Sequence, residues 1–214
     1  MKIICISDIH GKLFPVKKLV SEISGADLLL VAGDLTNFGG YSEAIDVLEE
    51  LGKIGSEILC VPGNCDTIEV IRALEEKYCS VHGKRVIYRD LGIAGFGGSP
   101  PTPFDTPLEF GEEEILSKLS VAEQGDILLT HAPPKNTNLD KVFFGVHAGS
   151  ISVRKIIEEK KPILNVCGHI HEGRGICRIR ETTVVNPGPL FRKYYAVAYI
   201  NDKGVRVELK KISS

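Results

Sequence analysis

The feature of this sequence best suited to chemistry is a pair of histidines separated by one residue. His169 and His171 follow the short apolar run 163–167, with Gly168 between the run and the pair. Such a run predicts a buried strand that ends at the glycine. In an extended chain the two rings would share one face, and the glycine would let a ligand approach closely. The pair could therefore hold a metal ion, although an isolated pair is more often one solvated and one hydrogen-bonded histidine.

Similar donor residues stand at the ends of four other strand-like runs. They are Asp8 and His10 after run 2–7, Asp34 after run 27–31, Asn64 after run 57–61 and His131 after run 126–130. This mixture of carboxylate, amide and imidazole donors suits metals such as manganese, iron or zinc. Seven donors exceed the needs of one tetrahedral ion, so two neighbouring ions that share a carboxylate are the economical arrangement.

Strands and helices that would position these donors alternate along most of the chain. Besides the five strand-like runs, helices are expected over residues 14–23, 41–51, 68–78, 111–120 and 153–160. Alternation of this kind predicts a parallel or mixed sheet with both faces covered. In such sheets the binding crevice lies beyond the carboxyl ends of the strands, so we expect the donors to meet there.

Two further regions have a different character. The glycine-rich segment 92–98 lacks the Lys-Ser/Thr pair of a phosphate-binding loop and has no helical pattern after it, so it predicts a strand that enters the proline-rich loop 99–107. Near the C-terminus, runs 178–185, 194–200 and 205–209 are expected to form successive antiparallel strands, with residues 201–204 as a turn.

Length and composition limit the kind of protein. The 214 residues are 43% apolar, which predicts one domain over residues 1–214. A formal charge of -2 argues against strong nucleic-acid binding, and leaves a nucleic-acid substrate only as a local contact. No apolar run approaches the ~20 residues of a membrane helix, and Asp8 comes too early for a signal peptide, so we expect a cytoplasmic protein with no membrane partner. The six cysteines form no C-x-x-C pair, and three of them lie in apolar runs as small hydrophobes.

Five motifs occur in a fixed order between residues 7 and 171. They are Asp8-x-His10, Gly33-Asp34, Gly63-Asn64-x-Asp66, the His131 loop and Gly168-His169-x-His171. In this order they resemble the metallophosphoesterase, or calcineurin-like phosphoesterase, superfamily, and the stretch 168–175 is similar to its prokaryotic phosphodiesterase-like branch. The resemblance implies an α/β fold, a four-layer α/β/β/α sandwich of two mixed sheets flanked by helices, with the metal site at the carboxyl ends of the strands.

The same resemblance implies the ligand sets and the reaction. Asp34 would bridge two divalent ions, of manganese, iron, zinc or nickel with manganese favoured. The first ion would be held by Asp8, His10, Asp34 and His171, and the second by Asp34, Asn64, His131 and His169. A hydroxide between the ions would hydrolyse a small phosphoester in line, more readily a diester than a monoester, with a nucleotide among the candidate substrates. The alternative is a binding scaffold that keeps the fold without turnover, which missing ligands would signal; all seven are present here. The oligomeric state is left open.

One motif departs from the family. Where the family commonly carries a histidine that is thought to protonate the leaving group, this sequence has Cys65. We assign Cys65, Asp66 and His147 to catalysis, the last because it lies in the polar loop 136–149 and could reach the crevice. The alternatives are a core thiol for Cys65 and an ordinary surface position for His147, which is equally plausible. Asn37 and Asn64 are expected to bind substrate, although a turn-forming role explains Asn37 equally well. His82 has no such context and is expected to be structural or solvated.

Overall fold

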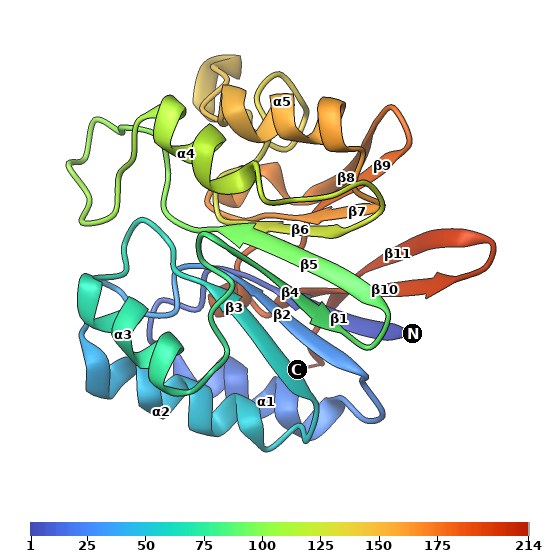
Figure 1. The fold of residues 1–214 in the computed structure, drawn as a ribbon. Coiled ribbons are helices and arrows are strands. Elements are labelled where there is room, and N and C mark those ends of the chain that lie inside the picture. Colours follow the sequence, from blue (N-terminus) through green and yellow to red (C-terminus); the bar gives the residue numbers. More distant parts are fainter. Residues whose placement is uncertain (214) are drawn as a thin grey trace.

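The computed structural model describes residues 1–213, except for the side chain of Phe144. Two stacked sheets form its centre, with helices α1 to α3 on one outer face and α4 and α5 on the other (Figure 1). This arrangement confirms the four-layer α/β/β/α sandwich. The layers follow from the sequence, since the central strands are apolar on both faces and each helix is apolar on one.

The first sheet has the strand order β11-β10-β1-β2-β3. Strands β1, β2 and β3 are mutually parallel, and β10 runs antiparallel to β1. Its elements are β1 (Lys2–Ile6), β2 (Leu28–Ala32), β3 (Glu57–Val61), β10 (Tyr194–Asn201) and β11 (Gly204–Lys211), and its helices are α1 (Leu13–Glu22), α2 (Tyr41–Gly52) and α3 (Ile68–Glu76).

The second sheet has the strand order β4-β5-β6-β7-β9-β8. Strands β5, β6, β7 and β9 are parallel, and β4 and β8 are antiparallel edges. Its elements are β4 (Lys84–Tyr88), β5 (Leu91–Phe96), β6 (Ile127–Thr130), β7 (Leu164–Val166), β8 (Gly175–Ile179) and β9 (Thr182–Asn186), with α4 (Glu112–Leu119) and α5 (Ile151–Lys160) on its outer face. Three short 3-10 turns, η1 (Phe143–Gly145), η2 (His171–Gly173) and η3 (Leu190–Arg192), lie in the loops.

Alternate residues of each central strand face different cores. In β1, Ile3 and Cys5 pack between the two sheets, whereas Ile4 and Ile6 pack under the helices of the first sheet. The same period of two places Leu129 of β6 between the sheets and Leu128 against α4 and α5. Both sheets therefore bury a shared central core, which fixes how their strand ends meet. All six cysteines are free thiols, as expected.

The C-terminal strands differ in part from the prediction. Residues 178–185 were expected to form one strand, but the chain turns at Arg180, whose φ of 52° is left-handed, and forms the hairpin of β8 and β9. Strand β9 then pairs in parallel with β7 in the second sheet, while β10 and β11 form a hairpin in the first. The two-residue turn of Arg180 and Glu181 was overlooked because β-branched residues stand on both sides of it. The edge strand β4 was also missed, because its alternation is weak.

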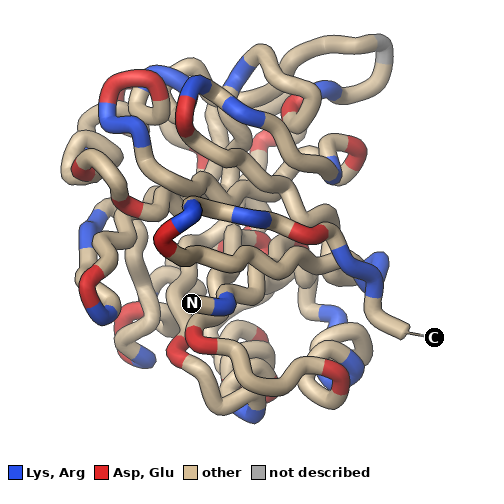
Figure 2. The backbone as a smooth tube through the Cα atoms, turned by 90° about the vertical axis from the view of Figure 1, so that its right-hand side faces the viewer, with Lys and Arg blue, Asp and Glu red and all other residues tan. Residues whose placement is uncertain are grey.

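The outer edge strand of the first sheet carries charges of both signs. Strand β11 crosses the middle of Figure 2 toward the C-terminus, with basic and acidic residues alternating along it. Glu208 pairs there with Arg206 and with Lys210. Charged edges of this kind oppose pairing with another chain. Among residues 1–213, each helix is too short or too polar to cross a membrane.

Candidate metal centre

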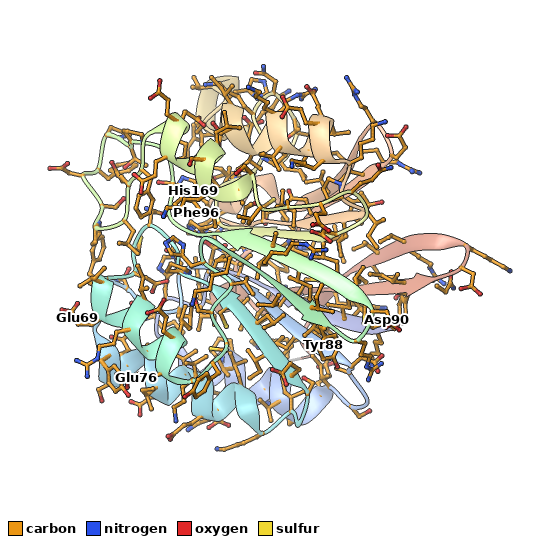
Figure 3. All side chains as sticks on the ribbon, in the orientation of Figure 1. Glu69, Glu76, Tyr88, Asp90, Phe96 and His169 are labelled. Atoms are coloured by element: carbon orange, nitrogen blue, oxygen red, sulfur yellow. The ribbon has the colours of Figure 1, made fainter. Side chains whose placement is uncertain are left out.

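All seven predicted donors lie at one end of the sandwich, where strands of both sheets end. Strands β1, β2 and β3 deliver Asp8, His10, Asp34 and Asn64 from the first sheet, and β6 and β7 deliver His131, His169 and His171 from the second. Figure 3 labels His169 at the end toward which the arrow of β5 points. We expected the donors to meet at one edge of one sheet. The structure brings together strand ends of two sheets.

One group of donors lies around Asp8. The Nε2 atom of His171 is 3.3 Å from Asp8 Oδ1 and 3.4 Å from His10 Nε2. The same His10 nitrogen is 3.5 Å from Asp34 Oδ2. Two imidazole nitrogens and two carboxylates thus converge on one point, which is the chemistry of a divalent-metal site.

A second group lies around Asn64. Its amide oxygen is 2.9 Å from His131 Nε2 and 2.8 Å from His169 Nδ1. His131 Nε2 is also 3.5 Å from Asp34 Oδ2. Asp34 therefore belongs to both groups, and the grouping matches the two ligand sets that the family resemblance implied.

Four of the donors have a backbone conformation that is rare outside glycine. The φ angles of Asp8, His10, Asp34 and His169 are 54°, 49°, 52° and 67°. Each such residue costs of the order of 1 kcal/mol and persists only where its surroundings enforce it. Part of the enforcement is visible, because the N–H groups of Ile9 and His10 donate to the Asp34 carbonyl at 2.8 and 2.9 Å. Strained backbone at four of the seven donors fits a functional site, although such conformations also occur elsewhere in the chain.

Two glycines next to donors have no room for a side chain. A Cβ atom on Gly63 would overlap the carboxylate of Asp34. On Gly168 it would overlap the Ser7 hydroxyl and lie 2.8 Å from Asp8 Oδ2. These glycines explain why the motifs read Gly-Asn and Gly-His: the backbone passes directly beneath a neighbouring ligand.

The carboxylates of the site are buried close together. Burial raises the pKa of Asp34 well above its ordinary value, and the charges of Asp8 and Asp66 raise it further. Burial alone would raise the pKa of Asp8 too, but the hydrogen bond from His171 and the charges of the nearby rings lower it to about 2. Asp8 Oδ2 is buried and has no hydrogen-bond partner among the described residues. An unpartnered buried oxygen beside crowded carboxylates fits bound cations.

Burial holds His131 and His169 in the neutral form that binds metal. Burial lowers the pKa of His169 to about 3, and His131 adds to the effect; burial also lowers the pKa of His131. Neutral rings of this kind can ligate metal. The Ala32 carbonyl lies 2.8 Å from His131 Nδ1 and so fixes the Nε2 atom toward the site. Asn186, which the sequence analysis missed, donates to the carbonyls of Gly168 and Ile170 and holds the histidine loop.

Asp66 does not have the catalytic position that we expected. Its side chain is fully buried and accepts hydrogen bonds from the N–H groups of Leu35, Thr36 and Gly63 and from the Thr36 hydroxyl. These bonds tie the loop after β2 to the loop after β3. Asp66 is thus a positioning residue for Asp34 and Asn64, because it shapes the backbone of both motifs.

Cys65 and Asn37 lie at the edge of the centre. The Cys65 side chain is half-buried, and its sulfur lies within 4.8 Å of donor atoms of His10 and Asp34. Its N–H donates to Asp34 Oδ1 at 2.9 Å. The expected proximity of Cys65 to the donors is therefore observed. Asn37 is exposed and close enough to His10 to affect its pKa, although burial, which lowers that pKa, is the larger effect.

His147 lines a pocket of about 630 Å³ that His169 and His171 also line. Its Nδ1 atom is 2.7 Å from Asp140 Oδ1, and Asp140 is fully buried. The structure therefore brings His147 beside the metal centre, as expected, and adds a partner seven residues upstream that no spacing rule suggested. His82 is structural: it accepts a hydrogen bond from the Gly97 N–H and stacks on Phe96.

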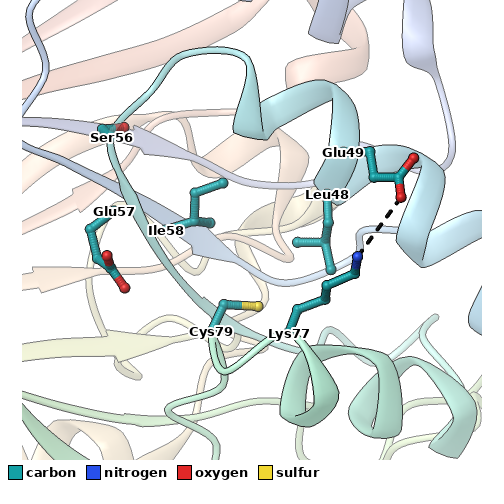
Figure 4. Close-up of a pocket in the computed structure, with 7 residues that line it drawn as sticks. All are labelled: Leu48, Glu49, Ser56, Glu57, Ile58, Lys77 and Cys79. Atoms are coloured by element: carbon teal, nitrogen blue, oxygen red, sulfur yellow. Dashed lines mark ion pairs between the residues drawn. The ribbon is translucent and has the colours of Figure 1, made fainter.

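A smaller pocket of about 250 Å³ lies at the amino end of β3, between α2, β3 and the segment after α3. Figure 4 shows the ion pair of Lys77 and Glu49 in its lining, where the charged atoms are 3.8 Å apart, together with Leu48, Ile58 and Cys79. The described lining holds Glu49, Glu57 and Cys79 but no histidine, and these residues are not among the metal-type clusters of the described chain. The chemistry of the molecule concentrates in the other pocket.

Two stacked mixed sheets with candidate metal-ligand clusters at their strand ends are typical of the metallophosphoesterase class. The chain belongs to the calcineurin-like phosphoesterase family, whose sequence profile, Metallophos, matches residues 1–173. This match confirms the family that the five motifs indicated. Family and donor set together support a metal-dependent phosphoesterase in general.

Individual relatives match over nearly the whole chain. The uncharacterised protein MJ1162 of Methanocaldococcus jannaschii is 45% identical over 196 residues, 88% of each chain. Human metallophosphoesterase domain-containing protein 1 is 29% identical over 217 residues, which cover 86% of this chain and 65% of that protein, just under two thirds of its length. The crystal structure of TT1561 of Thermus thermophilus has a TM-score of 0.78 at 20% identity and covers 99% of both chains, a likeness that shows the fold alone.

Proposed function

We propose that the protein is a binuclear metal-dependent phosphodiesterase. The observation that carries the proposal is the position of Asp34 Oδ2, which is 3.5 Å from both His10 Nε2 and His131 Nε2. One carboxylate oxygen thus faces both donor groups, as a bridging ligand must. Two divalent cations, with manganese favoured, would supply an activated nucleophile near neutral pH and neutralise phosphate charge.

The chain's own residues would orient the substrate and handle its protons. Asn37 lies exposed beside His10, where its amide can donate to a phosphate oxygen. His147 has Nδ1 engaged by Asp140, so Nε2 is the ring nitrogen left to exchange a proton with the leaving oxygen. Asn64 keeps its amide oxygen toward the imidazoles because its amide nitrogen donates to Thr106 Oγ1 at 3.0 Å.

Cys65 supports a preference for diesters with good leaving groups. A thiol is a weak hydrogen-bond donor, so at this position it assists a poor leaving group less than an imidazole would. We expect activated aryl phosphodiesters to be hydrolysed readily and alkyl phosphomonoesters slowly. Replacement by histidine should raise activity on alkyl-leaving esters more than on nitrophenyl esters, at unchanged metal content.

The test is a screen of phosphodiesters and phosphomonoesters with manganese, iron, zinc and nickel. We expect manganese-loaded protein to hydrolyse diesters fastest, with small nucleotides among the substrates. Faster turnover of monoesters would correct the ester class but leave the metal centre in place. A protein that binds two ions and hydrolyses none of these esters would instead be a scaffold.

A further inference from the structure

The pocket beside the metal centre is large enough for a sizeable organic group. Its volume of about 630 Å³ falls within the range of small-molecule sites. His169 and His171 line its inner end, and its outer walls come from the loops 100–104 and 142–149. The group esterified to a phosphate at the metal centre would therefore enter this pocket.

A carboxylate fixes the first of these loops. Glu109 accepts hydrogen bonds from the N–H and hydroxyl groups of both Thr102 and Thr106, at 2.6 to 3.0 Å. Thr106 Oγ1 in turn accepts a hydrogen bond from the side-chain amide nitrogen of Asn64, one of the seven candidate metal ligands. Phe104 lies between the two threonines. Its loop is therefore held by hydrogen bonds within the loop and by one to the metal centre.

A second carboxylate fixes the other loop. Asp140 is fully buried and accepts hydrogen bonds from N–H groups at both ends of the longer loop 136–149, which includes 142–149. They belong to Asn136 and Thr137 at one end and to Gly149 at the other. Asp140 also holds His147. Both loops are therefore pre-organised, which lowers the entropy lost when a ligand binds.

The two loops present an apolar surface made of aromatic and proline rings. Phe104 is 80% exposed and Phe143 is 73% exposed, and three proline rings stand beside Phe104: Pro100, Pro101 and Pro103. Exposed phenyl rings at a pocket mouth stabilise the protein little unless something covers them. Aromatic rings favour flat partners in stacked or edge-on contact.

The charged lining is sparse. Among the described lining residues, Lys135 carries a positive charge, against the carboxylates of Glu112 and Glu172. Glu112 is already engaged at the start of α5, where it accepts from Ser150 Oγ and from the N–H groups of residues 151 and 152. One lysine against two carboxylates gives no place for additional phosphates on the organic group.

We propose that this pocket receives the ester group of the substrate and selects one that carries a planar, largely apolar ring, with Phe104 and Phe143 as the specificity-determining residues. The inference rests on the proposed phosphoesterase function, since it places the phosphate at the metal centre. It narrows the substrate class to phosphoesters, diesters above all, that have a single phosphate and carry an aromatic or nucleobase-like group. Nucleoside polyphosphates fall outside it.

Binding of three phosphonates to the manganese-loaded protein tests the inference without turnover. Methylphosphonate, cyclohexylphosphonate and phenylphosphonate share the anionic group and differ only in the organic part. By calorimetry we expect phenylphosphonate to bind about tenfold more tightly than methylphosphonate, with cyclohexylphosphonate between them. Phe104→Ala and Phe143→Ala should each remove most of this ratio and leave methylphosphonate unchanged. Phe14→Ala on α1, where the ring is 62% exposed, is the matched control and should change none of the affinities.

The outcomes separate the two proposals. Equal binding of the three phosphonates, or an unchanged ratio in both phenylalanine variants, overturns the pocket inference even if esters are hydrolysed. A phenyl preference that depends on Phe104 and Phe143 supports the pocket even if the ester screen finds no turnover, in which case only the proposed function fails.

Discussion

The metal centre and the pocket loops lie next to each other but are built in opposite ways. The centre is formed at strand ends, where Asp8, Asp34 and His131 are at most 2% exposed, whereas the loops carry Phe104 and Phe143 at 80% and 73% exposure. The first is fixed by the core of both sheets, the second by single carboxylates in otherwise exposed segments. Reactivity and selectivity therefore reside in parts of the molecule with different tolerance to change.

The carboxylates that hold these two regions in place, Asp66 and Glu109, also differ in their surroundings. Asp66 is buried under the metal centre and bonds to three backbone N–H groups of two strand-end loops. Glu109 braces one pocket loop while partly exposed to solvent. Loss of Asp66 should affect the whole fold, whereas loss of Glu109 should affect only its own loop.

The sharpest test of the centre is removal of the shared ligand. Asp34→Ala should abolish measurable turnover, a loss of about a thousandfold or more, because both donor groups lose a carboxylate. Elemental analysis after metal loading should fall from two ions per chain to fewer than one. His131→Ala, in the second group alone, should retain one ion. If the parent protein saturates at one ion, and Asn64→Ala and His131→Ala leave that value unchanged, the second site does not exist.

Removal of the brace under the centre should have the next largest effect. Asp66→Ala leaves three buried N–H groups without an acceptor, which should lower the free energy of unfolding by about 3 kcal/mol. Urea denaturation would measure it. Asp46→Ala on the exposed face of α2 is the control and should stay within about 0.5 kcal/mol of the parent. Equal stability of the Asp66 variant would show that the two loops hold each other without it.

These two effects concern the part of the molecule that could be predicted from its sequence. Strand ends such as Gly33-Asp34 are marked by a change from apolar to polar residues, so donors and core strands were found together. Asn186 was not, because its partners lie 16 and 18 residues away and are fixed only by tertiary contact. Asp140 was not either: its partners lie in its own loop, but an irregular loop has no repeating period that would mark them. Asp66 was found but misassigned, since its motif position says nothing about which way its carboxylate points. The turn at Arg180 was missed because left-handed conformation there is imposed by pairing of β8 and β9 rather than by a glycine.

On the pocket side, His147 should contribute to turnover far more than to folding. His147→Ala should lower kcat by about a hundredfold, the usual contribution of a positioned proton donor, with a nearly unchanged melting temperature. His82→Ala provides the opposite case, since His82 stacks on Phe96 and is absent from the donor clusters, so its loss should lower the melting temperature but not the kcat of folded protein. If the His147 variant kept full activity, His147 would have only a structural role beside Asp140.

The smallest effect belongs to the brace of the first pocket loop, and it has a defined pH dependence. Burial alone would raise the pKa of Glu109, but the hydrogen bonds from Thr102 and Thr106 outweigh it and lower the pKa from 4.5 to about 2. A lowered folded-state pKa means that the ionised group stabilises the fold fully above pH 4.5, and that this contribution is lost as the pH falls toward 2. Solvent screening at this partly exposed site reduces this contribution to about 1 kcal/mol.

The difference in unfolding free energy between the parent and Glu109→Gln should therefore be constant at neutral pH and shrink steadily below pH 4.5. A difference that stays the same in acid would mean that Glu109 acts through its shape and not its charge. Loss of the phenyl preference in this variant, with two metal ions still bound, would show that the loop can fail while the centre remains intact.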